Sequence, residues 1–167
     1  MINEILVIDD NLDIRQLISS ILKDNGFLVR EAANYDQALS EINKKIPDLA
    51  IIDVKLDKGD NDGIELLKHL KKKNDDVHVI MISGHANVQM AVDSLKLGAF
   101  EFMQKPFSSE RLVNFVFRAL ENKTLKNEQA IIHSQQESND LWDDIEKLES
   151  DVTNIRIFVG NGLNKNH

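Results

Sequence analysis

Residues 5–10 read Ile-Leu-Val-Ile-Asp-Asp, a run of four apolar side chains that ends on two carboxylates. Four further short apolar runs follow along the chain, and most of them are rich in isoleucine and valine. They are Phe27–Val29, Leu49–Ile52, Val77–Ile82 and Ala99–Met103. Strands that are apolar on both faces are typical of parallel sheets, which helices cover on both sides.

The segments between these runs place apolar residues at helical spacing. Three such sets are Ile14, Leu17, Ile18, Ile21 and Leu22; Ile64, Leu66, Leu67 and Leu70; and Val88, Ala91, Val92 and Leu95. Each set predicts an amphipathic helix. Gly26 and Gly98 follow two of these helices, where the left-handed backbone that glycine accepts commonly ends a helix. The alternation predicts an α/β fold built on a doubly wound, five-stranded parallel sheet.

The composition limits the classes of function. Among 167 residues, 28 Asp and Glu outnumber 20 Lys and Arg, which gives a formal net charge of −8. This acidity argues against direct DNA binding, which depends on Lys and Arg contacts with phosphates. The absence of cysteine excludes disulfides, Cys-ligated metals and thiol catalysis. Because the apolar runs are too short to cross a bilayer and no basic signal sequence begins the chain, we expect a cytoplasmic protein without membrane contact.

Polar residues follow four of the five predicted strands. They are Asp9 and Asp10 after the first strand, Asp53 after the third, Ser83-Gly84 after the fourth and Lys105-Pro106 after the fifth. Sheets of this type bind ligands at the carboxyl ends of their strands, so we expect these side chains to converge on one rim. Any one of them could belong to an ordinary polar loop, but together they indicate a site.

Three carboxylates that lie close together repel one another at neutral pH, so the cluster needs a cation or a proton. Mg²⁺ fits this oxygen-rich set, because it keeps several waters and accepts phosphate oxygens from a substrate. A carboxylate beside Mg²⁺ can attack phosphorus and form an aspartyl phosphate. A lysine and a hydroxyl would then hold the phosphoryl oxygens as charge moves between them.

This order and spacing of Asp9-Asp10, Asp53, Ser83 and Lys105-Pro106 resemble the receiver domain of two-component response regulators over residues 3 to about 122. The resemblance implies that Asp53 is the phosphoacceptor. It also implies that Mg²⁺ is held by Asp9, Asp10, Asp53 and the backbone carbonyl of Lys55.

The same resemblance assigns roles to residues around the phosphoacceptor. Lys105 would contact the phosphoryl group, and the bond between Lys105 and Pro106 would be cis. Ser83 and Phe102 match the pair that switches on phosphorylation, in which the hydroxyl moves toward the phosphate and the ring turns inward. His85 occupies a position where family members tune water attack on the aspartyl phosphate, although we favour a surface histidine without that role.

In detail the chain is similar to the NtrX-type regulators of the nitrogen-regulation family, from the long polar loop at residues 55–63 to Phe102. The resemblance implies a sensor histidine kinase as partner. It also implies a homodimer through the fourth helix, the fifth strand and the fifth helix. We expect self-phosphotransfer and autodephosphorylation only, with no enzymatic turnover of an external metabolite.

Residues 123–167 differ in character from the receiver domain that we assign to residues 1–122. We assign residues 123–140 to a helix extension and linker, because Asn, Gln and Ser are frequent over residues 134–140. Spacings of four and three then relate Leu141, Ile145, Leu148, Val152 and Ile155. These make about two heptads, fewer than a coiled coil needs. Residues 155–159 favour the start of a strand.

A AAA+ ATPase domain follows the receiver in the resembled regulators, and residues 145–160 resemble its first helix and strand. The Walker A loop of such a domain requires glycine, lysine and a hydroxyl where this chain has Lys165, Asn166 and His167. We therefore interpret residues 141–167 as a degenerate or truncated remnant of a AAA+ domain start and expect no ATP binding.

Other functions remain open from the residues alone. A Mg-dependent phosphohydrolase with an Asp nucleophile would need Asp-x-Asp, but Lys55 stands two residues after Asp53. A flavodoxin-like electron carrier would need a glycine- and hydroxyl-rich phosphate loop after the first strand, where Asp9 and Asp10 would repel a phosphate. A decayed receiver that serves only as an interaction module or phosphate sink is the alternative to a working response regulator.

Overall fold

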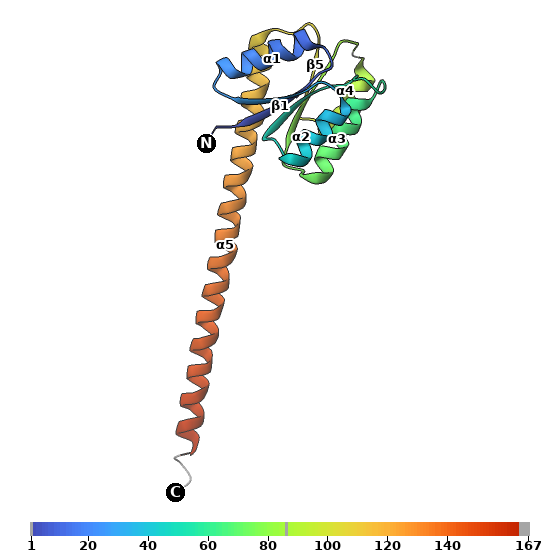
Figure 1. The fold of residues 1–167 in the computed structure, drawn as a ribbon. Helices are drawn as coiled ribbons and strands as arrows, with labels where there is room; N and C mark the ends of the chain where they lie inside the picture. The colour runs from blue at the N-terminus through green and yellow to red at the C-terminus, as the bar shows by residue number, and fades with distance from the viewer. Residues whose placement is uncertain (1, 86, 164–167) are drawn as a thin grey trace. The chain divides into compact units, whose positions relative to one another are not determined.

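The computed structural model describes residues 2–85 and 87–163, and within them five parallel strands form one sheet in the order β2-β1-β3-β4-β5 (Figure 1). The strands are β1 (Glu4–Ile8), β2 (Leu28–Ala32), β3 (Leu49–Asp53), β4 (His78–Ser83) and β5 (Glu101–Gln104). The helices between and after them are α1 (Leu12–Asp24), α2 (Tyr35–Lys44), α3 (Asp62–Lys73), α4 (Val88–Lys96) and α5 (Ser109–Leu163). This is the predicted doubly wound α/β fold.

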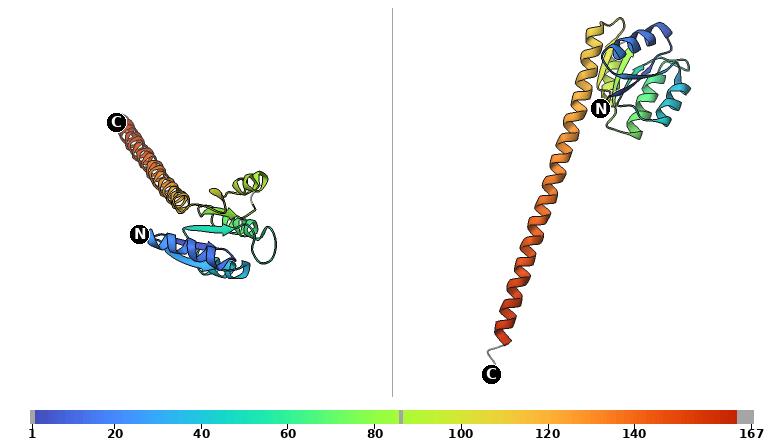
Figure 2. Two further views of the ribbon diagram at one scale, coloured as in Figure 1. Left: turned by 90° about the horizontal axis from the view of Figure 1, so that it is seen from above. Right: turned by 60° about the vertical axis from the view of Figure 1, so that its left-hand side comes forward.

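Helices cover both faces of the sheet, which explains why the inner strands β1, β3 and β4 are almost entirely buried and mainly apolar, whereas the edge strands β2 and β5 also carry polar residues. Leu6 and Ile8 of β1 point into a core shared with α2 and α3, while Ile5 and Val7 point into a second core shared with α1 and the first turns of α5. Figures 1 and 2 show these two layers on opposite sides of the sheet.

Local sequence signals set the ends of several helices. The side chains of Asn11, Asn34 and Asn87 accept hydrogen bonds from the first turns of α1, α2 and α4, which satisfies amide groups that a helix leaves free. Gly26 and Gly98 adopt φ angles of 87° and 100°, the left-handed conformation predicted for them.

The amphipathic helix predicted from Val88, Ala91, Val92 and Leu95 is confirmed as α4. Its apolar stripe is mainly exposed: Val88 is 81%, Leu95 46% and Val92 37% accessible. The helix instead buries Ser94, whose hydroxyl donates to the carbonyl of Met90. Helical periodicity identifies an apolar face but cannot show whether the sheet or another partner covers it.

The chain divides into two units with a boundary between Lys123 and Thr124. The second unit is helical where the structure describes it, because α5 continues to Leu163. The strand favoured from residue 155 is therefore wrong, whereas the assignment of residues 123–140 to a helix extension and linker stays a prediction. The assignment of residues 141–167 to a AAA+ remnant stays a prediction, and its Walker A comparison at residues 164–167 lies outside the described residues. None of the described helices is apolar enough over a sufficient length to cross a membrane.

Candidate functional site

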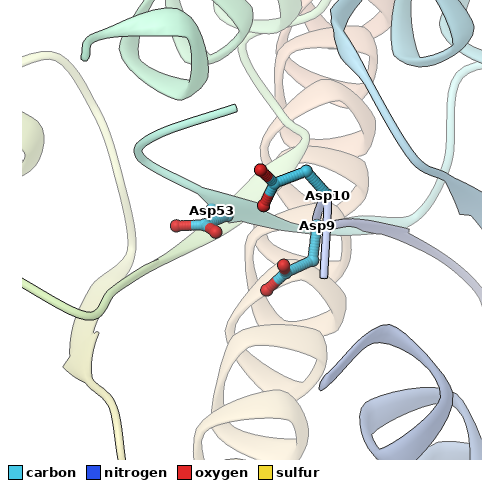
Figure 3. Close-up of side chains that lie close together, drawn as sticks. All are labelled: Asp9, Asp10 and Asp53. Carbon is cyan, nitrogen blue, oxygen red and sulfur yellow. The ribbon is translucent and has the colours of Figure 1, made fainter. Parts of the chain in front are cut away.

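The carboxyl ends of β1 and β3 bring three aspartates together. Strand register pairs Ile8 with Ile52, so the residues that follow β1 lie beside Asp53 at the end of β3. One carboxylate oxygen from each of Asp9, Asp10 and Asp53 lies within 4.8 Å of the others (Figure 3). Asp9 and Asp53 are buried, whereas Asp10 is exposed.

Lys105 brings a positive charge from the end of β5 to two of these carboxylates. Its Nζ lies 2.8 Å from Oδ2 of Asp9 and 3.1 Å from Oδ2 of Asp53, donating a hydrogen bond to each. The amide of Lys105 also donates to the carbonyl of Ser83, which holds the ends of β4 and β5 together. The peptide bond between Lys105 and Pro106 is cis.

Burial and neighbouring charges shift the pKa values of Asp53 and Lys105. Burial, reinforced by the neighbouring Asp9 carboxylate, raises the pKa of Asp53 to about 6, although Lys105 and the backbone amide of Lys55 oppose the rise. Burial alone would lower the pKa of Lys105, but the carboxylates of Asp9 and Asp53 outweigh it and raise that pKa. Lys105 therefore stays charged at neutral pH. Asp53 titrates about one pH unit below neutrality.

Ser83 is buried at the end of β4, and its Oγ accepts a hydrogen bond from the amide of His85 at 3.2 Å. Phe102 of β5 is half-buried and packs against the core that contains Met81 and Ala99. An open cavity of about 560 Å³ borders these strand ends. Its lining includes Asp10, Asp53, Lys55, Ser83, His85 and Lys105.

Comparison with known proteins identifies this arrangement. Residues 5–117 match the response regulator receiver domain family. The chain belongs to that family. Over 128 residues the receiver domain is 43% identical to the nitrogen assimilation regulatory protein NtrX of Azorhizobium caulinodans, covering 77% of this chain and 28% of that protein. The chain thus spans under a third of the length of this relative.

Two solved structures extend the comparison. The receiver domain of NtrX from Brucella abortus is 44% identical, with a TM-score of 0.66, and the match covers 70% of this chain and 98% of that one. The beryllofluoride-activated NtrC4 receiver domain dimer is 33% identical, with a TM-score of 0.67, and the match covers 72% and 98%. The chain is therefore an NtrX-like receiver domain of a two-component system.

The donor set of this receiver domain fits a hard divalent cation. Three carboxylates that gather beside one buried ammonium leave excess negative charge, and oxygen is the ligand that Mg²⁺ prefers. Burial, with the neighbouring Asp9 carboxylate, raises the pKa of Asp53, which means that ionising this carboxyl group carries a free-energy cost. An added cation at Asp9, Asp10 and Asp53 would reduce that cost.

Two residues that support the site were not assigned roles from the sequence. A Cβ at Gly63 would lie 2.0 Å from the carbonyl oxygen of Asp53, so only glycine lets α3 start against the end of β3. The buried carboxylate of Asp62 accepts from the amide of Lys58 at 2.6 Å and so closes the loop after β3. The Asp-Gly pair at the start of a helical pattern was the available signal.

Proposed function

We propose that this receiver domain accepts a phosphoryl group from a sensor histidine kinase onto Asp53, with Mg²⁺, as part of an NtrX-type response regulator. The observation that carries the proposal is the Asp53 carboxylate, which lies at a strand end between two further aspartates and Lys105 and opens onto a cavity. Because such kinases draw phosphate from ATP, the reaction would take place in the cytoplasm.

In the transfer, an Asp53 oxygen attacks the phosphorus of a phosphohistidine. The new bond joins that oxygen to phosphorus, the phosphorus–nitrogen bond breaks, and the kinase imidazole leaves. The attacking carboxylate must be ionised, and a pKa of about 6 leaves it mostly ionised at neutral pH. Lys105, already within hydrogen-bond distance of Asp53, is placed to hold a phosphoryl oxygen once the group is transferred.

Asp9, Asp10, Asp53 and the backbone carbonyl of Lys55 are the groups that would hold Mg²⁺. When bound, this ion would supply positive charge that offsets the carboxylates and the phosphoryl oxygens. The charge of the Lys55 side chain is paired with Asp60, whose Oδ1 lies 3.0 Å from Nζ. The carbonyl role is therefore compatible with any side chain at this position.

Ser83 and Phe102 are proposed to carry the signal away from Asp53. The Ser83 hydroxyl now accepts from the His85 amide, and a phosphoryl group would offer it a stronger, charged partner. Turning toward that partner would release the His85 amide and let the loop before α4 move. The half-buried ring of Phe102 lies on the adjacent strand β5, where it can follow this movement.

The phosphorylated form is proposed to dimerise through α4, β5 and α5. Val88, Val92 and Leu95 expose apolar surface on α4, which a second copy would cover. The dimeric, beryllofluoride-activated relative supports this proposal, because beryllofluoride stands in for a phosphoryl group on the aspartate.

Incubation with acetyl phosphate and Mg²⁺, followed by intact-mass spectrometry and size-exclusion chromatography, tests both parts. Wild type should gain the mass of one phosphoryl group and elute as a dimer, and Asp53→Asn should do neither. An adduct on Asp53→Asn would refute the assignment of the phosphoacceptor. An adduct on wild type without a change in size would refute dimerisation alone.

A further inference from the structure

The Arg15 side chain of α1 reaches back to the acidic loop after β1. Its Nη1 donates to the backbone carbonyl of Asp9 at 2.8 Å, and its Nε donates to Oε2 of Glu31 at 3.2 Å. Only 12% of the side chain is accessible. We propose that Arg15 is a positioning residue that orients Asp9 and Asp10 for Mg²⁺, an inference that rests on the proposed function.

The carbonyl that Arg15 holds belongs to the peptide group that joins the two aspartates. Because a peptide group is planar, fixing its oxygen limits the directions in which both flanking side chains can leave the backbone. Two other hydrogen bonds hold Asp9 in this loop. The Asp9 amide donates to the carbonyl of Ala32, and the Asp9 carboxylate accepts from the amide of Asn11. The contact from Arg15 extends this order to Asp10, whose own side chain is exposed.

The start of α1 does not require this side chain. Asn11 already caps the helix, since its Oδ1 accepts from the amide of Ile14 and its carbonyl accepts from the amide of Arg15. The ion pair with Glu31 adds little stability by itself, because Glu31 is one-third accessible. Glu31 instead balances the guanidinium charge beside a site that must attract a cation.

The sign of the effect separates positioning from simple electrostatics. Removing a positive charge beside a cation site strengthens Mg²⁺ binding if charge alone matters. Removing a group that orients the ligands weakens it, and losing an outer partner of a metal ligand typically costs about 10- to 100-fold in metal affinity. Arg15→Gln should therefore bind Mg²⁺ at least about tenfold more weakly than wild type.

Arg30 in the middle of β2 provides a matched control, because its guanidinium reaches Glu4 at the start of β1 and not the aspartates that follow the end of that strand. Its guanidinium also bonds carboxylates and carbonyls, namely those of Glu4, Glu41 and Lys45, and its side chain is 21% accessible. Arg30→Gln should lose at least as much stability as Arg15→Gln, because Arg30 makes four hydrogen bonds and Arg15 two, yet it should keep wild-type Mg²⁺ affinity.

The test is a Mg²⁺ titration of the full chain, followed by the backbone amide NMR signals of Asp10 and Lys55, with thermal unfolding measured in parallel. Arg15→Gln with affinity equal to or above wild type would overturn the positioning role. Should Arg15→Gln fail to fold, Arg15→Lys replaces it, and we expect a several-fold loss because one ammonium cannot reproduce the two-nitrogen contact. Wild-type affinity in Arg15→Lys would then refute the inference. Absence of Mg²⁺ binding in wild type would refute the proposed function itself, and with it the role of Arg15.

Discussion

Replacing Asp53 by asparagine should stabilise the metal-free receiver domain at neutral pH. Burial and the Asp9 carboxylate raise the pKa of Asp53 from its ordinary value of 3.8 to about 6, and only 7% of the residue is accessible. That difference corresponds to about 3 kcal/mol of folding free energy. Asparagine has nearly the same shape and no charge, so the substitution removes this cost.

The pH dependence gives the prediction its sign. The folded protein keeps a proton on Asp53 up to about pH 6, whereas the unfolded chain releases it near pH 4. Proton binding by Asp53 therefore contributes fully to folding stability below pH 4, and this contribution is lost as the pH rises through about 6. Wild type and Asp53→Asn should therefore have similar stability at pH 4. At pH 7.5 the variant should be more stable by up to about 3 kcal/mol.

Urea denaturation in EDTA, followed by the methyl NMR signals of Ile5, Ile51 and Ile80 in the buried sheet, measures this difference. Measurements at pH 4.0 and 7.5 lie on either side of the isoelectric point near 5.1. Asp75→Asn is the control, because Asp75 has a side chain that is 94% accessible and should show no such change. An equal free-energy difference between wild type and Asp53→Asn at both pH values would refute the electrostatic reasoning.

Three further predictions follow from the same geometry. Lys105→Met should raise the pKa of Asp53 above its wild-type value, because the substitution removes a cation that lowers this pKa. A carboxyl ¹³C NMR titration measures the pKa, and an unchanged value would contradict the prediction. Gly63→Ala should destabilise the fold by about 1–3 kcal/mol or more in urea denaturation, because the added Cβ would clash with the carbonyl of Asp53. Gly84→Ala is the control and should keep wild-type stability, because a Cβ there meets open space. Mg²⁺ at 100 times its Kd should stabilise wild type by about 2.7 kcal/mol, EDTA should reverse this, and Asp10→Asn should lose most of the gain.

The sheet and most of the site could be predicted because both depend on local signals. Apolar runs located the inner strands closely and the edge strands β2 and β5 only approximately, because those two carry polar residues. The rule that parallel strands end on one rim brought Asp9, Asp53 and Lys105 together before any contact was known. The glycines at positions 26 and 98 were predictable because a left-handed helix end is a property of a few neighbouring residues.

Contacts between distant segments could not be predicted in this way. The bond from Arg15 to Asp9 depends on how α1 turns back over its loop, and the approach of Gly63 to Asp53 depends on how α3 meets β3. The strand expected from residue 155 is helical in the structure, because a helix already formed upstream extends at the cost of fixing only one residue at a time. Local preference for a strand was therefore overridden.

Asp53 itself is proposed to carry the phosphoryl group. Borohydride reduces an aspartyl phosphate to homoserine, so treating the phosphorylated full chain and mapping its peptides by mass spectrometry locates the modified residue. Homoserine at position 53, formed only with Mg²⁺ and a phosphodonor, is the predicted result. Homoserine at position 9 or 10, or no homoserine at all in wild type treated with the phosphodonor, would contradict the assignment of the phosphoryl group to Asp53.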